Sequence, residues 1–234
     1  MEGIVLSVVP YREKDAIVTI LGDDDCKHAL KVSGMFKMGS RSGALIQKHF
    51  HIAFQKVEAK GFPILTNVEL KNAFPLLHQQ LLSVVAADYI CEWFEKCDVS
   101  LPFHLLQYYL NSLTIDFYRT LCLFQAFVND MEGIRPHVDS CVRCGSTKNI
   151  AAISNKDGGF LCKTCARLSS AQRTKDELFH YRILGKISVE GYDKLTNYTF
   201  DKSDFLNQLL IYEEYGSIRW KSQMFLKKMI QQKV

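Results

Sequence analysis

Two Cys-x-x-Cys pairs constrain the fold of this chain more than any other feature: Cys141 with Cys144, and Cys162 with Cys165. Tetrahedral Zn²⁺ takes four thiolates about 2.3 Å from the metal, and a two-residue gap lets one tight turn direct two of them at one point. The sequence between the pairs predicts a β-hairpin with its turn at residues 157–159, which brings the second pair back to the first. Gly145 gives the first turn its backbone freedom. The spacing therefore predicts one structural zinc ion.

Other roles for these four cysteines fit the sequence less well. Four unrelated buried thiols would share no spacing. A catalytic dithiol is normally a single Cys-x-x-Cys beside a βαβ pattern, which this chain lacks. A catalytic zinc keeps one coordination position open for water and usually has histidine or carboxylate ligands, whereas a four-cysteine site is closed. We expect the metal to hold structure and to take part in no reaction.

The chain has 234 residues, 47% of them hydrophobic, which is enough for one full core or for two or three small modules. Residues 76–140 are net acidic, while both flanking segments are net basic. We find no signal peptide at the start and no apolar run near the ~18 residues of a membrane span. The other cysteines stand among apolar neighbours, as reduced thiols do: Cys26, Cys91, Cys97 and Cys122. These features predict a cytoplasmic protein.

The N-terminal third predicts successive β-strands, at residues 3–9, 16–21, 28–33, 45–59 and 62–70. Two of them alternate with period two, which is typical of a sheet with one buried side. The first alternating set is Phe50, Ile52 and Phe54, and the second is Phe62, Ile64, Thr66, Val68 and Leu70. Short strands in this number suit a small barrel, and an oligonucleotide-binding (OB) fold is the commonest of these. An SH3-like barrel fits the same pattern.

From Pro75 the hydrophobic period becomes helical. The pattern predicts helices at about 75–96, 102–113 and 115–131, with Gly133 ending the third. After the cysteine module we expect helices at about 170–189, 201–215 and 217–233. The dense aromatic faces of these helices are typical of a core and less so of a ligand pocket.

Basic residues indicate where a polyanion would bind. Between residues 27 and 71 lysine and arginine far outnumber acids, so a nucleic acid lying there would release counterions. Aromatic side chains stand among these charges and offer surfaces for base stacking: Tyr11, Phe36, Phe50 and Phe54. An ordinary solvated surface is the alternative. The basic segment 217–233 fits either a nucleic-acid or membrane contact, or a helix that packs its apolar face on the domain.

Several segments, in this order along the chain, resemble the RecO family of bacterial recombination mediators: EGIVLSVVPYREKDAIVTIL, KMGSRSGALIQKHFHIAF, NAFPLLHQQLLSVVAADYICEWFEKC, CVRCG, LCKTC and IRWKSQMFL. The resemblance implies an α+β multidomain protein. Residues 1–75 would form an N-terminal OB-fold β-barrel, and residues 76–138 with 169–234 an α-helical domain. Residues 139–168 would form an inserted four-Cys zinc-finger module.

The same resemblance implies a function in DNA repair and recombination. The family binds single- and double-stranded DNA, anneals complementary strands, associates with RecR, and helps RecA replace single-strand binding protein (SSB), whose acidic C-terminal tail it receives. Carried across by position, the cationic barrel loops are residues 11–14 and 37–41. The resemblance therefore implies phosphate contacts by residues of these loops: Arg12, Lys14, Lys37 and Arg41. Because the second loop carries only two positive charges, we expect other cations to contribute to DNA binding: Lys27, Lys31, Lys48 or the terminal basic helix.

The sequence does not favour an enzyme or a small-molecule substrate. Zinc deaminases pair His-x-Glu with Pro-Cys-x-x-Cys, and here Ser140 and Leu161 precede the two cysteine pairs. His-Glu-x-x-His, a Walker loop and a dinucleotide glycine motif are absent from the sequence. His137, near the metal, is expected to have no ligand role. The alternative function is a non-enzymatic zinc-ribbon adaptor that binds a protein in replication or transcription. As a recombination mediator the protein would associate with the nucleoid.

Overall fold

The computed structural model describes residues 1–99, 101–166 and 172–232. They divide into two compact units, Met1–Ile115 with Trp220–Val234, and Asp116–Arg219. The predicted boundary between residues 168 and 169 lies outside the described residues, and the other domain boundaries stay predictions. Within the described ranges no helix combines the length and the apolar character needed to cross a membrane.

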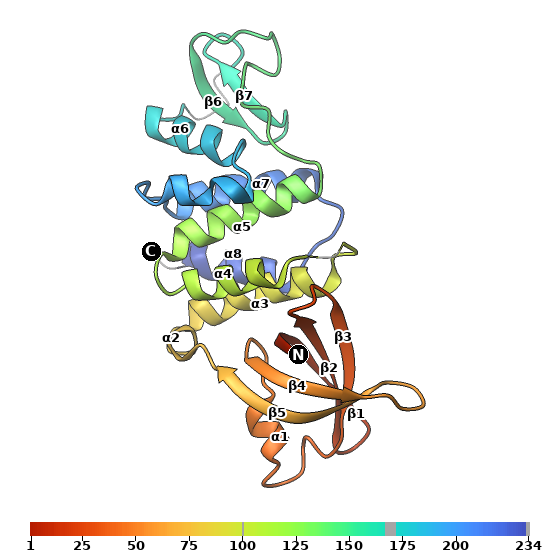
Figure 1. Ribbon diagram of the computed structural model, residues 1–234. Helices are drawn as coiled ribbons and strands as arrows, with labels where there is room; N and C mark the ends of the chain where they lie inside the picture. Colours follow the sequence, from red (N-terminus) through yellow and green to blue (C-terminus); the bar gives the residue numbers. More distant parts are fainter. Residues whose placement is uncertain (100, 167–171, 233–234) are drawn as a thin grey trace. The chain divides into compact units, whose positions relative to one another are not determined.

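The first unit begins with a closed barrel whose strand order is β1-β2-β3-β5-β4 (Figure 1). The strands are β1 (Glu2–Tyr11), β2 (Asp15–Gly22), β3 (Lys27–Val32), β4 (His51–Val57) and β5 (Ile64–Asn72). β1 pairs antiparallel with both β2 and β4, and β3 meets β5 in parallel at Lys31 and Ile64. A short helix, α1 (Arg41–Leu45), stands between β3 and β4. The predicted N-terminal barrel is confirmed, and this order is OB-like.

The barrel core confirms one predicted strand face and corrects another. Ile52 and Phe54 are buried in the core, as predicted. On β5, however, Leu65 is the buried core residue, and of the predicted face only the partly buried Val68 packs against the core. Asn67 has φ +49°, and the pairing slips between Thr66 opposite Gln55 and Glu69 opposite Ala53, so β5 holds one extra residue. Such a bulge changes which side chains face inward, which a strict period of two does not anticipate.

Two predicted element boundaries are wrong. Leu45 ends α1 rather than beginning a strand, because the Ser40 side chain accepts a hydrogen bond from the Gly43 amide and caps a helix there. The helix predicted over 75–96 is two helices, α2 (Pro75–His78) and α3 (Leu81–Lys96). They separate at Gln80, whose backbone is extended.

The last helix, α8 (Lys221–Gln232), packs on α3 within the first unit, and α4 (Phe103–Ser112) also contacts α3. Leu226 and Ile230 are buried in this contact. Two polar contacts fix it: the Ser222 amide donates to Glu92 Oε2 at 3.1 Å, and Gln223 Nε2 donates to Tyr89 Oη at 3.0 Å. The apolar face of the basic terminal segment is therefore used for packing.

Polar contacts also tie the barrel to α3. Lys48 Nζ and His49 Nε2 lie 2.6 Å and 3.1 Å from Asp88 Oδ1. Lys27 Nζ donates to the backbone carbonyl oxygens of Glu95, at 3.0 Å, and of Cys97. Burial lowers the pKa of His49 even though the bond to Asp88 opposes this. Burial raises the pKa of Asp88, but the bonds from His49 and Lys48 outweigh it and leave the pKa below its usual value.

The second unit contains α5 (Phe117–Met131), β6 (Ile150–Ser154), β7 (Gly159–Cys162), α6 (Lys175–Leu184), a 3₁₀ helix η1 (Val189–Leu195) and α7 (Lys202–Tyr215). α5 packs on α6 and α7. A buried hydrogen bond links α5 to α7, because Asn129 Nδ2 donates to the backbone carbonyl of Gln208 at 3.1 Å. Gly133 ends α5 with φ +69°, as predicted. The start of the helix predicted at 170–189 lies partly outside the described residues, and its end is wrong because α6 stops at Leu184.

The α8 contact makes a testable prediction about stability. Leu226→Ala should lower the free energy of unfolding by about 2–5 kcal/mol, because it leaves a cavity under a fully buried side chain. Met224→Ala on the same helix is the matched control, and it should change the value by less than about 0.5 kcal/mol because Met224 is half exposed. Urea denaturation followed by tryptophan fluorescence reports this unit, which holds both Trp93 and Trp220. Equal effects of the two variants would contradict the packing of α8.

The barrel junction makes a prediction about pH. The folded pKa of His49 is lowered, so the unfolded chain takes up this proton first as pH falls below about 6.5. Stability should therefore decrease from about pH 8 to pH 5. His49→Asn should flatten that decrease, and asparagine tolerates the φ of +74° found there. The exposed His104→Asn is the control and should leave the pH profile unchanged, whereas parallel profiles for wild type and His49→Asn would refute the prediction.

Candidate metal centre and nucleic-acid interface

The sulfur atoms of Cys141, Cys144, Cys162 and Cys165 converge, as predicted. All four lie within 4.8 Å of one another, and those of Cys144 and Cys162 are 3.6 Å apart. Tetrahedral coordination with bonds of about 2.3 Å places thiolates about 3.8 Å apart. The donor set and its spacing therefore fit one four-coordinate metal ion.

The two cysteine turns have the same backbone construction. The Gly145 amide donates to the Cys141 carbonyl, and the Ala166 amide donates to the Cys162 carbonyl, both at 2.8 Å. Gly145 has φ +72°, a conformation that favours glycine, as predicted. Each turn thus directs two sulfur atoms to the same side.

The hairpin of β6 and β7 brings the turns together. Ile150 pairs with Cys162, so the end of β7 carries the second cysteine pair back toward the first. The Val142 amide also donates to the Phe160 carbonyl at 2.9 Å, which joins the first turn to β7. The predicted β-hairpin between the pairs is confirmed.

Side chains around the cysteines reinforce this arrangement. Arg143 forms an ion pair with Asp157 at 2.8 Å and donates to the Cys165 carbonyl at 3.3 Å, so it links the first turn to the hairpin turn and to the second pair. His137 lies outside the cysteine cluster, and its Nε2 is 2.9 Å from Ser140 Oγ.

The environment of Cys141 favours a thiolate. Burial raises the pKa of this thiol, but backbone hydrogen bonds from Cys162, Arg143 and Cys144 outweigh it and bring the pKa to about 6. Metals bind the thiolate form, so the peptide groups prepare this ligand for a cation.

The predicted nucleic-acid contacts fall into two groups. Four of them lie at one end of the barrel, three on two loops and Arg41 at the first residue of α1, and we call them the loop-end cations: Arg12, Lys14, Lys37 and Arg41. The loops meet there, because the Phe36 amide donates to the Lys14 carbonyl at 3.1 Å and the Gly34 amide donates to Asp15 Oδ1 at 2.8 Å. All four are exposed, and none forms an ion pair within the part of the chain that the structure describes. Glu13 is an exposed acid on the same turn.

The other three predicted cations are engaged elsewhere. Lys31 Nζ is 3.1 Å from Asp15 Oδ2. This ion pair, after the hydrogen bond from the Gly34 amide, lowers the pKa of Asp15. Lys27 and Lys48 hold the barrel against α3. The partners of Lys27 and Lys48 are distant in the sequence, so the sequence does not indicate that these two lysines are engaged.

The aromatic side chains near the loops differ in availability. Phe54 is 2% exposed and belongs to the barrel core, with Phe50 packed against it, so neither offers a face to a base. Phe36 is 50% exposed and stands beside Lys37. Two hollows of about 360 and 320 Å³ flank α1, one lined in part by Phe36 and Lys37 and the other by Arg41. Tyr11 is half-buried, and the Arg12 guanidinium lies 5.2 Å from its ring centroid, so Phe36 is the most exposed of the four stacking candidates.

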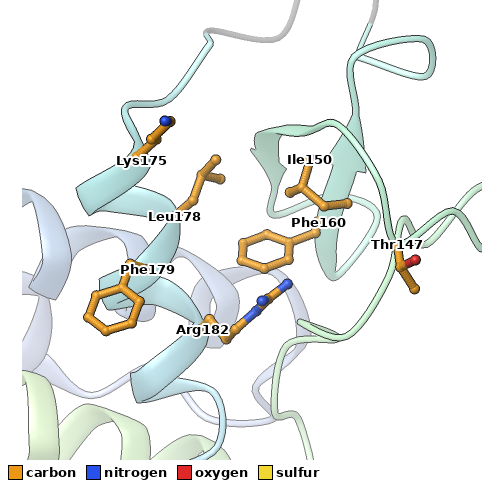
Figure 2. Close-up of a pocket in the computed structure, with 7 residues that line it drawn as sticks. All are labelled: Thr147, Ile150, Phe160, Lys175, Leu178, Phe179 and Arg182. Atoms are coloured by element: carbon orange, nitrogen blue, oxygen red, sulfur yellow. The ribbon is translucent and has the colours of Figure 1, made fainter.

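Sequence reasoning missed a hollow of about 300 Å³ in the second unit, between α6 and the β6–β7 hairpin (Figure 2). Its lining includes Phe160, Phe179, Lys175 and Arg182. The spacing of Lys175, Leu178, Phe179 and Arg182 was the available signal, because residues at such intervals share one helix face.

Comparisons with known proteins agree with this architecture. Residues 1–74 match the family model described as recombination protein O N terminal, and residues 103–203 match recombination protein O C terminal. Among curated relatives, a DNA repair protein RecO of Bacillus pumilus is 28% identical over 97% of this chain and 93% of its own length. One of Halalkalibacterium halodurans is 28% identical over 96% and 92%. One of Listeria monocytogenes is 24% identical over 97% and 93%. With both models matched in order and these relatives spanning nearly the whole chain, the protein belongs to the RecO family of DNA repair proteins.

Proposed function

We propose that this protein is a non-enzymatic recombination mediator that holds DNA on the loop end of its barrel. It binds single- and double-stranded DNA, promotes annealing of complementary strands and, with RecR, assists the loading of RecA onto SSB-coated single strands. Membership of a DNA repair family supports the class of function. The proposals of DNA binding, strand annealing and RecA loading rest on the family resemblance and on the loop-end cations.

One observation carries the proposal: the four loop-end cations form no ion pair in the described ranges, while Lys27, Lys31 and Lys48 are engaged in internal contacts. A cation without a partner is free to displace counterions from a phosphate. One of the two loops joins β1 to β2, and in the OB fold this loop is among those that commonly contact oligonucleotides. Phe36 adds an exposed ring for a base.

The proposed mechanism is physical. Strands held along a cationic surface have their mutual repulsion screened, and the stacking and pairing of bases then supply the free energy of annealing. No covalent bond is made or broken, and no small-molecule substrate is required.

The cysteine cluster would hold Zn²⁺ as a structural ion. Four thiolates fill its coordination, so no position is left for water or substrate. The ion would fix the β6–β7 hairpin in the second unit. The proposed partners are DNA, RecR and the acidic SSB tail, with a functional link to RecA, in a cytoplasmic, nucleoid-associated protein. A zinc-ribbon adaptor for another protein is the alternative function.

Salt titration of single-stranded DNA binding tests the interface. The logarithm of affinity should fall linearly with the logarithm of salt concentration, by about 0.7 per phosphate contact on a single strand. Arg12→Ala combined with Arg41→Ala should weaken binding and flatten the slope by about 1.4, because two phosphate contacts are lost. Fluorescence anisotropy of a labelled oligonucleotide measures both quantities.

A matched control removes two exposed lysines of the second unit, Lys194→Ala with Lys202→Ala, which should preserve the slope. If the loop-end and control variants have the same slope as wild type, the surface is wrongly assigned. No binding of oligonucleotide at any salt concentration would instead support the adaptor.

Metal analysis tests the zinc proposal. Protein purified without chelator should contain one zinc ion per chain, and Cys144→Ser should lose it because a ligand is missing. Cys26→Ser removes an exposed cysteine outside the cluster and should retain the ion. If wild-type protein purified in this way contains no metal, the zinc proposal is wrong and a redox role for these cysteines is favoured.

A further inference from the structure

The second unit contains a pocket that neither the proposed barrel site nor the metal centre uses. It is about 300 Å³ and lies between α6 and the β6–β7 hairpin, as Figure 2 shows. Its lining residues are Thr147, Ile150, Phe160, Lys175, Leu178, Phe179 and Arg182. None of them is acidic. The pocket thus combines an apolar interior with two positive charges.

The two cations stand on one face of α6. Lys175 and Arg182 are seven residues apart, which is about 10.5 Å along a helix axis, and the apolar Leu178 and Phe179 lie between them. Arg182 is oriented from inside the unit: its Nε donates to the Val138 carbonyl at 3.0 Å, and its Cζ is 5.4 Å from the centroid of the Phe160 ring. Neither cation forms an ion pair among the residues that the structure describes.

An exposed ring lies between these charges. Phe179 is 47% exposed although it is a large apolar side chain. The ring contacts Tyr198, which follows η1 in the sequence, and the centroids of the two rings are 5.8 Å apart. A ring that is fixed on one side and open on the other offers a stacking surface at low entropic cost.

The positive charge continues along the hairpin. Lys148 and Lys163 are exposed near the Ile150 end of β6, where the Lys163 amide donates to the Asn149 carbonyl at 2.8 Å. Two cations close in sequence to this region are paired with acids, since Arg143 pairs with Asp157 and Lys186 pairs with Asp139. The pocket lining and the adjoining end of the hairpin thus hold four cations that form no ion pair among the described residues: Lys148, Lys163, Lys175 and Arg182.

We propose that this pocket is a second nucleic-acid site, which takes one base of a single strand on the exposed ring of Phe179 and its flanking phosphates on Lys175 and Arg182. Cations spaced along a line with a ring between them match the repeating phosphate and base of a strand better than one compact acidic group. Thr147 supplies the one neutral polar side chain of the lining, so recognition is sequence-tolerant. A protein with this site and the barrel site contacts nucleic acid through both of its units.

Photocrosslinking of the full-length protein tests the site directly. A single-stranded oligonucleotide carrying 5-iodouracil should crosslink to the α6 peptide that contains Phe179, identified by mass spectrometry. Lys175→Ala combined with Phe179→Ala should abolish that crosslink and raise Kd for the oligonucleotide about five- to tenfold, the low end of what one stacked base contributes. Both side chains are exposed, so circular dichroism of this variant should match wild type.

The matched control is Lys194→Ala combined with Met131→Ala, which removes an exposed lysine and an exposed apolar side chain of the same unit, neither of them in the pocket lining, and should leave Kd and the crosslink unchanged. The crosslink should persist in the Arg12→Ala, Arg41→Ala variant, so failure of the barrel proposal is distinguishable from failure of this one. An unchanged Kd with no crosslink on α6 would overturn the proposal. So would a pocket variant that keeps DNA affinity but loses binding of a short acidic peptide.

Discussion

The pairing of β1 with both β2 and β4 is the constraint on which the first unit depends. Because one strand joins both sides of the sheet, the barrel closes and no edge of β1 is left open. Closure also fixes where the connections emerge. The turn after β1 and the loop after β3 leave the barrel at the same end, and the backbone bond between Phe36 and Lys14 joins them. The cationic surface is thus a consequence of strand order.

Internal pairing then decides which cations remain available. Asp88 engages Lys48 and His49, Asp15 engages Lys31, and the carbonyl groups at the end of α3 engage Lys27. The contacts of Lys48, His49 and Lys27 hold the barrel on α3, and together with the Asp15–Lys31 pair they remove three lysine charges from the surface that a nucleic acid can use. The remaining loop-end cations are fewer than a count of lysines and arginines indicates. An interface with few contacts is expected to have a correspondingly modest salt dependence.

In the second unit one hairpin has two roles. Cys162 of β7 contributes to the small core around the cysteines, while Phe160 of the same strand packs with Tyr181 and Ile211 in the core that includes α6. The hairpin that presents the metal ligands therefore also forms a wall of the pocket. A structural ion would act on the pocket through this strand, because it limits the movement of the hairpin relative to α6.

The sequence by itself determined the features whose cause is local. The two-residue spacing of the cysteines, the turn at 157–159 and the alternation of Phe50, Ile52 and Phe54 depend on neighbours within a few residues, and the structure has them as predicted. Only the tertiary structure decided the inward face of β5, where a bulge at Asn67 shifts the alternation. It also decided which cations are free and that α6 and the hairpin enclose a pocket. These features depend on partners distant in the sequence, and the charge of a residue does not specify which partner folding brings to it.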